Sequence, residues 1–294
     1  MKVLMYGGTG SQAGPTVKHL LRQGHTPHVL TRNLDKANEL KGAGGVPVVA
    51  DLADFDRLRA ATREVDSVAF LLPAFLDNPG DGLVFGRNAV DAAVQAGIGM
   101  FAWNASGEVS EDNSESNTIL QIFRHLQDSG LPFVVFEPTT YMENWLGPWT
   151  APSVRNRDEL SYPVLADRKI GWIASDDVGA LVVAALERPE LAGNRYRISG
   201  VETPTGPQLA ALFSGALGRD IHYRTMTPEQ MGAVLDQEFG PGAGDGVAEM
   251  YRQEQEDPDP PTKYHDMTSV LEALPVKMST ITDWVKAHKE AFVQ

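Results

Sequence analysis

A glycine-rich turn close to the start of the chain is the first pattern that could do chemistry. The run Gly7-Gly8-Thr9-Gly10-Ser11-Gln12-Ala13-Gly14 directly follows a short apolar segment and precedes a helical pattern. Glycines at a strand end let the backbone approach a pyrophosphate, and the next helix points its free N–H groups at the phosphates. The pattern G-x-x-G-x-x-(G/A) falls on Gly7, Gly10 and Ala13. We therefore predict a dinucleotide site here, with contacts from Gly7, Thr9, Gly10, Ser11, Gln12 and Ala13.

The end of the second expected strand indicates which dinucleotide binds. A carboxylate at this position would accept hydrogen bonds from the ribose hydroxyls of NAD. The chain instead reads Thr31-Arg32-Asn33, with Lys36 one turn later. Arginine offers a planar fork for a 2′-phosphate, although a solvated arginine is the alternative interpretation. We expect NADP(H) as the cofactor, with NAD(H) less favoured, held by Arg32 and Lys36.

Residues after the later strands would complete the cofactor site. Asp51 and Leu52 follow the third expected strand and would face the adenine. Asp51 either accepts from the exocyclic amine of the adenine or caps the following helix. Further contacts are expected from Leu72, Pro73, Asn104, Pro138 and Tyr141, because ligands of open α/β sheets bind beyond the carboxyl ends of the strands.

The elements that must position these residues alternate short apolar runs with helical patterns, which is the rhythm of βαβ units. Several runs are apolar throughout, as is typical of strands buried on both faces. We predict an α/β fold with a doubly wound parallel sheet. The expected strands are Lys2–Tyr6, His28–Thr31, Val46–Ala50, Ser67–Leu72, Met100–Trp103, Phe133–Phe136, Ile170–Ala174 and Arg195–Ser199. The expected helices are Pro15–Gln23, Leu34–Lys41, Asp54–Thr62, Leu83–Ala96, Asn117–Ser129 and Asp176–Leu186.

The chain loses this rhythm beyond Glu137, where prolines and aromatic residues suggest an excursion from the sheet on the substrate side. Later, the stretch from Glu229 to Asp259 holds nine acidic residues against one basic residue, Arg252. A solvated face and a partner site both explain such a stretch. Within it, the glycine-rich run from Gly240 to Gly246 predicts a mobile loop.

Composition excludes several classes of function. The 294 residues carry a formal net charge of −14, which disfavours polyanionic partners such as nucleic acid or an anionic membrane. The chain has no cysteine, so disulfides, thiolate metal sites and cysteine nucleophiles are excluded. Neither a metal-binding His-Glu-x-x-His nor a Gly-x-Ser-x-Gly pattern occurs, and no metal is expected. No apolar run reaches membrane-spanning length and no signal peptide pattern is present, so we expect a cytoplasmic protein.

Several motifs along the whole chain occur together: the glycine turn, Thr31-Arg32-Asn33, Asp51-Leu52-Ala53-Asp54, Ser129–Phe133, Tyr141-Met142-Glu143-Asn144, Ser175–Val178, Tyr196–Gly200 and Thr282-x-Trp284-Val285-x-x-His288. With these motifs the chain resembles the NmrA-like branch of the atypical short-chain dehydrogenases. The resemblance implies a Rossmann domain over 1–150, with 170–200 returning to it, and a smaller α/β substrate domain over 151–294. It also implies NAD(P) binding, and the family includes both small-molecule reductases and cofactor-sensing regulators.

The catalytic apparatus departs from that of ordinary short-chain dehydrogenases, in which a Lys four residues after a Tyr lowers the pKa of the phenol. None of the seven tyrosines has such a Lys, and no Lys stands near the start of the Asn117–Ser129 helix. Tyr141, Asn104 and Ser106 are the catalytic candidates, although each could be structural. Substrate contacts are expected from Phe75, Glu108, Glu143, Asn144 and Trp145, with core packing as the alternative for the tryptophan.

Together these patterns favour an NADPH-dependent reductase that passes a hydride to a small apolar carbonyl, quinone or conjugated acceptor. The proton would come from water, from Tyr141 or from a hydroxyl of the substrate itself. The alternative is a non-catalytic NAD(P)H sensor that acts through a protein partner. A homodimer is kept as a candidate assembly.

Overall fold

The chain folds into two compact units. The computed structural model describes residues 1–73, 76, 78, 80–110 and 117–293, without the side chains of residues 34, 36, 37 and 40. Unit 1 contains residues 1–138, 175–198 and 268–277, and unit 2 contains residues 139–174, 199–267 and 278–294. The chain leaves unit 1 at Pro138, where a strand ends, rather than at residue 150. The return of residues 268–277 to unit 1 had no signal in the sequence.

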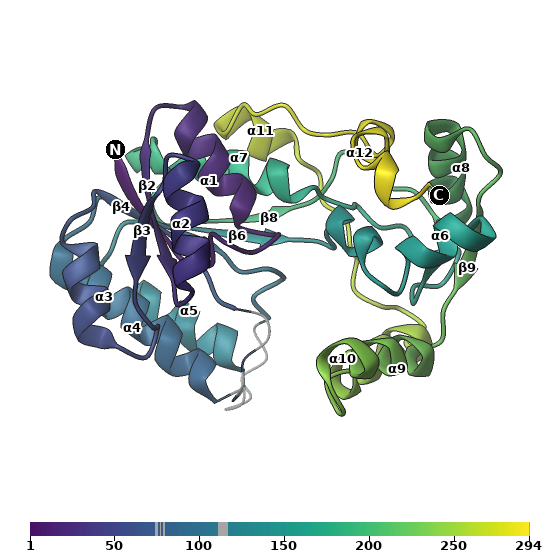
Figure 1. Ribbon diagram of the computed structural model, residues 1–294, viewed down its shortest axis with the longest axis horizontal. Helices are drawn as coiled ribbons and strands as arrows, with labels where there is room; N and C mark the ends of the chain where they lie inside the picture. Colours follow the sequence, from purple (N-terminus) through teal and green to yellow (C-terminus); the bar gives the residue numbers. More distant parts are fainter. Residues whose placement is uncertain (74–75, 77, 79, 111–116, 294) are drawn as a thin grey trace. The chain divides into compact units, whose positions relative to one another are not determined.

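Unit 1 is built on a seven-stranded parallel sheet, with strand order β3-β2-β1-β4-β5-β6-β8. The order reverses between β1 and β4, so the sheet is doubly wound and the predicted fold class is confirmed. Figure 1 shows this sheet with its flanking helices. The strands are β1 (Lys2–Met5), β2 (Thr26–Thr31), β3 (Val46–Val49), β4 (Ser67–Leu71), β5 (Met100–Asn104), β6 (Phe133–Pro138) and β8 (Asn194–Ile198).

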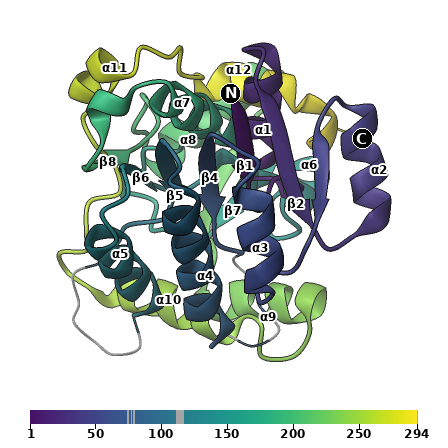
Figure 2. The same ribbon diagram turned by 90° about the vertical axis from the view of Figure 1, so that its left-hand side faces the viewer.

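Helices cover both faces of this sheet, as Figure 2 shows. One face packs against α3, α4 and α5, whose apolar residues share a core with β1, β4 and β5. The other face packs against α1 and α7. A Cβ on Gly179 of α7 would lie 2.8 Å from the backbone nitrogen of Thr16, so these two helices touch closely. The helices are α1 (Gly14–Arg22), α2 (Leu34–Gly42), α3 (Phe55–Thr62), α4 (Asp81–Ala96), α5 (Thr118–Asp128), α7 (Ser175–Leu186) and α11 (Thr268–Ala273), with the 3₁₀ turn η2 (Pro189–Leu191).

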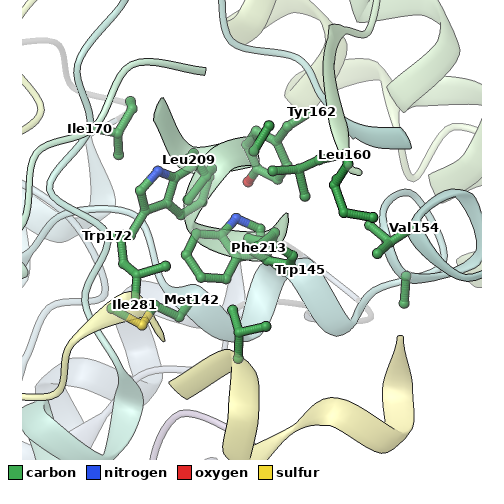
Figure 3. Close-up of a cluster of buried hydrophobic side chains, with 14 of the residues drawn as sticks. Met142, Trp145, Val154, Leu160, Tyr162, Ile170, Trp172, Leu209, Phe213 and Ile281 are labelled. Carbon is green, nitrogen blue, oxygen red and sulfur yellow. The ribbon is translucent and has the colours of Figure 1, made fainter. Parts of the chain in front are cut away.

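Unit 2 has its own core of aromatic residues, drawn in Figure 3. The ring centroid of Trp145 lies 4.7 Å from that of Trp172 and 5.1 Å from that of Phe213. Two parallel strands, β7 (Glu159–Tyr162) and β9 (His222–Thr225), support this core. The remaining elements are η1 (Met142–Leu146), α6 (Ala151–Arg157), α8 (Gly206–Leu217), α9 (Pro228–Phe239), α10 (Asp245–Glu256), α12 (Ile281–Ala287) and η3 (Lys289–Ala291).

The structure corrects one predicted strand and the extent of one predicted loop. The segment 170–174 is not a strand, because its amides bond to separate partners: Gly171 donates to Lys263 O and Ile173 to Thr140 O. Only isolated bridges result. The run from Gly240 is a turn up to residue 244, and α10 begins at Asp245. The amide of Gly244 donates to Asp236 Oδ1 at 2.8 Å, which ties this turn to α9.

Within the parts of the chain that the structure covers, no helix combines the length and the apolarity that crossing a membrane requires.

Candidate functional site

The glycine turn connects β1 to α1 in a conformation that its glycines allow. Gly7 has φ +70°, a left-handed conformation that glycine adopts without strain. The amide of Gly10 donates to Gly7 O at 2.9 Å, and that of Gly14 donates to Gly10 O at 2.8 Å. Helix α1 then begins with a proline in its first turn and no side-chain cap. Because the amides of Gly14 and Thr16 bond to Gly10 O and Ala13 O, and Pro15 has no N–H, an anion beside this helix would meet the turn residues that precede it rather than the first amides of α1.

Gly8 and Gly10 lack a side chain for different structural reasons. A Cβ on Gly8 would lie 2.8 Å from Val29 Cγ1 and 2.9 Å from Met5 Cγ, so Gly8 allows close packing of the turn against the sheet. A Cβ on Gly10 would meet only the carbonyl oxygen of Gly7, at 3.4 Å, and would otherwise face open space. Gly10 therefore leaves room that a side chain would fill, as a bound pyrophosphate requires. The motif spacing gave no sign of the packing role of Gly8.

A cavity of about 420 Å³ lies beside this turn, within unit 1. It extends over the carboxyl ends of β2 and β3 and brings together residues that the sequence predicted for the adenosine half of a dinucleotide. The cavity is lined by both apolar and polar residues, as the adenosine part of a dinucleotide requires. The residues present therefore fit the predicted cofactor. The lining residues are Gly7, Thr9, Leu30, Thr31, Arg32, Asn33, Ala50, Asp51, Leu52, Ala53, Pro73, Leu76, Asp81 and Phe85.

Arg32 and Asp51 face each other in this cavity. Arg32 Nη1 lies 3.6 Å from Asp51 Oδ2, and the two side chains are 71% and 42% exposed. The other oxygen of Asp51 accepts from the amide of Ala53 at 2.8 Å. Helix α3 is capped by Asp54, which accepts from the Arg57 amide, so the capping alternative for Asp51 is wrong. Lys36, also predicted to bind the cofactor, is in α2, and its side chain is outside the described part of the structure.

A second group of predicted residues meets on the other side of β1. The register pairs Asn104 with Leu71 and Phe136, so β4, β5 and β6 end side by side. Asn104 is buried, and its Oδ1 accepts from the amide of Ser106 at 3.0 Å. The hydroxyl of Ser106 donates to Oε1 of Gln12, in the glycine turn, at 2.9 Å. The structure thus joins the loop after β5 to the predicted cofactor turn.

A buried ion pair anchors the loop that carries these residues. The Glu137 side chain is 1% exposed and accepts from Arg195 Nε at 2.7 Å and from the Val109 amide at 3.0 Å. Arg195 also donates to Val109 O and lies over the ring of Phe123. Sequence reasoning missed Glu137, because an acidic residue in an apolar strand shows its partner only after folding. Glu108, predicted for the substrate, forms an ion pair with Arg197 at 2.5 Å.

Of the remaining candidates, Tyr141, Glu143, Asn144 and Trp145 lie in unit 2, Leu72 and Pro138 lie in unit 1, and Phe75 is outside the described residues. Tyr141 is buried and forms an isolated bridge with Ile173 directly before η1. Glu143 Oε1 accepts from Trp284 Nε1 at 3.3 Å. Trp145 is fully buried in the aromatic core, which favours the core alternative over a substrate contact. Pro138 and Leu72 lie at the ends of β6 and β4, as predicted.

Asn144 belongs to a buried cluster of hydroxyl groups. Its Nδ2 donates to the Tyr162 hydroxyl at 3.2 Å, and the Tyr251 hydroxyl donates to the same oxygen at 3.1 Å. Burial raises the pKa of Tyr162 to about 12, although these two hydrogen bonds act in the opposite direction. The phenol therefore stays protonated at neutral pH. The hydrogen bond to Tyr162 holds the Asn144 side chain in place. The Tyr162 hydroxyl does not titrate near neutral pH.

Unit 2 also contains a cavity of about 270 Å³, bordered by residues 163–170, the end of α10 and residues 260–264. The ammonium of Lys263 pairs there with Glu254. None of the residues predicted for the cofactor or the substrate lines this cavity. In the described part of the chain, acidic and histidine side chains do not gather in groups that could hold a metal ion.

The doubly wound parallel sheet, with a glycine turn at the point where the strand order reverses, defines a Rossmann-type protein. The model of the NmrA-like family matches residues 1–283. The chain therefore belongs to the NmrA-like family, which confirms the resemblance that its motifs indicated.

Characterised relatives match the chain from end to end. It is 28% identical over 303 residues to an NAD(P)H azoreductase of Xenophilus azovorans, with 99% of each chain covered. It is 27% identical over 293 residues to the (4-alkanoyl-5-oxo-2,5-dihydrofuran-3-yl)methyl phosphate reductase of Streptomyces griseus, again with 99% of each covered. The NADPH complex of an NADPH-dependent quinone oxidoreductase of Escherichia coli shares the fold. It is 20% identical with a TM-score of 0.79, covering 98% of this chain and 99% of that one.

Proposed function

We propose that this protein is an NADPH-dependent reductase. It transfers a hydride to a small apolar carbonyl, quinone or conjugated acceptor. The observation that carries the proposal is the position of Arg32 at the end of β2, in a cavity continuous with the glycine turn. The end-to-end similarity to two reductases, one of them named for NAD(P)H, supports the same activity.

Unit 1 supplies the groups that hold the cofactor. The turn from Gly7 to Ala13 receives the pyrophosphate, because Gly10 leaves space there and α1 begins directly after the turn without a side-chain cap. Arg32 receives the 2′-phosphate through its guanidinium fork. The phosphate then competes with the Asp51 carboxylate for the Arg32 guanidinium. Asp51 and Leu52 face the adenine. Leu72, Pro73, Asn104 and Pro138 complete the proposed contacts from unit 1, and Tyr141 of unit 2 is a further proposed contact.

The bound cofactor supplies a hydride from its nicotinamide ring. The chain's own residues orient the acceptor and deliver a proton to its reduced oxygen or nitrogen. Tyr141 is the proposed donor, because a protonated phenol can donate to the reduced acceptor without a neighbouring Lys. Water and a hydroxyl of the substrate are the other proton sources. Glu143 and Asn144 follow Tyr141 in the chain and are the proposed polar contacts to the substrate.

The experiment that tests this proposal follows NADPH oxidation at 340 nm with panels of azo dyes, quinones and enones. At least one panel should be reduced by the wild type and not by Gly10→Val, which should lose the cofactor. Consumption of NADPH by none of the panels, despite tight cofactor binding, would contradict the proposal.

The second candidate function is a non-catalytic NAD(P)H sensor that acts on a protein partner. The observation that favours it is the lack of a Lys four residues after any of the seven tyrosines. A sensor needs only the cofactor site of unit 1. Its partner affinity should change with added NADPH, whereas turnover stays at zero.

A further inference from the structure

The bond between Ser106 and Gln12 gives the glycine turn a polar side chain with a fixed orientation. The Ser106 hydroxyl donates to Gln12 Oε1 at 2.9 Å. This bond uses the acceptor end of the carboxamide and leaves Nε2, which carries two N–H donors, as the end that can reach a ligand. A long flexible side chain is thereby held in one orientation before any ligand arrives.

The backbone of Ser106, whose hydroxyl makes this bond, has an unfavourable conformation. Among the described residues other than glycine, only Ser106 and Asp158 have positive φ, and the value at Ser106 is 60°. Glycine would adopt this conformation more easily but would have no hydroxyl. The bond from the Ser106 amide to Asn104 Oδ1, at 3.0 Å, holds the backbone in place. Backbone strain of this kind is typical of ligand sites.

The sheet order shows which half of a dinucleotide Gln12 would meet. β1 lies between β2 and β4, and β5 follows β4 (Figure 2). The cavity with Arg32 and Asp51 lies over β2 and β3, whereas Gln12 reaches toward the loop after β5. A dinucleotide crosses such a sheet where the strand order reverses, so its two halves lie on opposite sides of β1. Gln12 is thus on the side away from the adenosine half.

We propose that the Gln12 carboxamide donates a hydrogen bond to an oxygen of the nicotinamide riboside half of the cofactor. Ser106 acts through Gln12 as a positioning residue and not as a proton donor. This inference rests on the proposed binding of NADP(H) at the glycine turn. It assigns Ser106 a role different from the catalytic one that its place after β5 suggested.

The test compares two ligands by calorimetric titration: NADPH, and 2′-phospho-ADP, which has the adenosine half and both phosphates but lacks the nicotinamide riboside. Gln12→Met keeps the side-chain volume and removes the amide. It should weaken NADPH binding about three- to tenfold, the effect of one neutral hydrogen bond, and leave 2′-phospho-ADP binding unchanged. Gln95→Ala, which removes an exposed glutamine from α4, is the matched control and should change neither affinity.

Ser106→Ala should show the same ligand dependence as Gln12→Met. The double variant should bind NADPH no more weakly than Gln12→Met alone, because Ser106 acts only through Gln12. Additive losses would overturn the positioning role. Equal loss of both ligands in Gln12→Met would assign its contact to the pyrophosphate, and no loss would remove the contact; either result overturns the proposal. A wild type that binds neither ligand would contradict the proposed function itself.

Discussion

The guanidinium of Arg32 and the carboxylate of Asp51 face each other at 3.6 Å across the ends of β2 and β3. Both side chains are exposed enough for solvent to screen their attraction, so the pair itself adds little stability. A phosphate placed between the turn and Arg32 would gain a charge-assisted contact that a ribose hydroxyl cannot give. From this relationship we expect NADPH to bind more tightly than NADH.

Arg32→Ala should therefore weaken NADPH binding about ten- to a hundredfold, the loss of one hydrogen-bonded charge, and leave NADH binding unchanged. Calorimetric titration of the wild type and the variant with both cofactors measures this directly. Arg57→Ala, which removes an exposed arginine in α3, is a matched control. Equal affinities of the wild type for NADPH and NADH would show that Arg32 is only a solvated side chain.

Gly10→Val and Gly8→Val should fail in different ways. At Gly10 the new side chain enters open space beside the turn, so the protein keeps its melting temperature and loses NADPH binding. At Gly8 the side chain would collide with Val29 and Met5, so the melting temperature should fall by several degrees. Thermal denaturation and NADPH titration of both variants separate the two effects. Normal NADPH binding by Gly10→Val would place the cofactor elsewhere.

Tyr141→Phe removes one hydroxyl from a buried ring and keeps the ring itself. If this hydroxyl donates the proton, turnover should fall by about one or two orders of magnitude, the low end of general acid catalysis. The affinity for NADPH should not change. Steady-state kinetics with the acceptor found for the wild type, together with cofactor titration, provide the measurement. A variant as fast as the wild type would leave water or the substrate as the proton source.

Tyr162 should make the stability of unit 2 depend on alkaline pH. Its pKa is about 12 in the folded protein and about 10 when exposed, so the unfolded chain loses the proton first as the pH rises. The free energy of unfolding should therefore fall between about pH 10 and pH 12, by up to about 3 kcal/mol for this group. Urea denaturation of the wild type and Tyr162→Phe across this window measures the difference. Tyr264→Phe, at an exposed position, is the control, and identical slopes in all three would refute the prediction.

The sequence predicted unit 1 well because its patterns are local. Each buried strand of the sheet is a short apolar run, and each helix has its own periodicity, so the boundaries differ by only a few residues. The glycine turn was recognisable because strand, turn and helix follow one another directly. The position of Arg32 directly after β2 was predicted by the same argument, since the end of a strand is a local feature.

Unit 2 was harder to predict because its elements depend on distant partners. The segment 170–174 is apolar enough for a strand, but Gly171 bonds to Lys263, far away in the sequence. Helices α8 and α9 did carry a usable local signal. Thr205 with Gln208, and Thr227 with Gln230, form capping boxes, each with a proline in the first turn. The left-handed backbone of Ser106 had no such signal, because the bond from its amide to Asn104 Oδ1 is visible only in the folded protein.

The central claim, hydride transfer from NADPH to a small acceptor, is tested most directly with NADPH that carries deuterium at both hydrogen positions of C4 of the nicotinamide, so that either face delivers the label. The purified protein is incubated with this cofactor and the acceptors of the panel, and the products are examined by mass spectrometry. We expect the reduced product to contain one deuterium at the carbon or nitrogen that receives the hydride, unless that position exchanges with solvent. An unlabelled product at a non-exchanging position, or tight NADPH binding with no product from any acceptor, would contradict the claim.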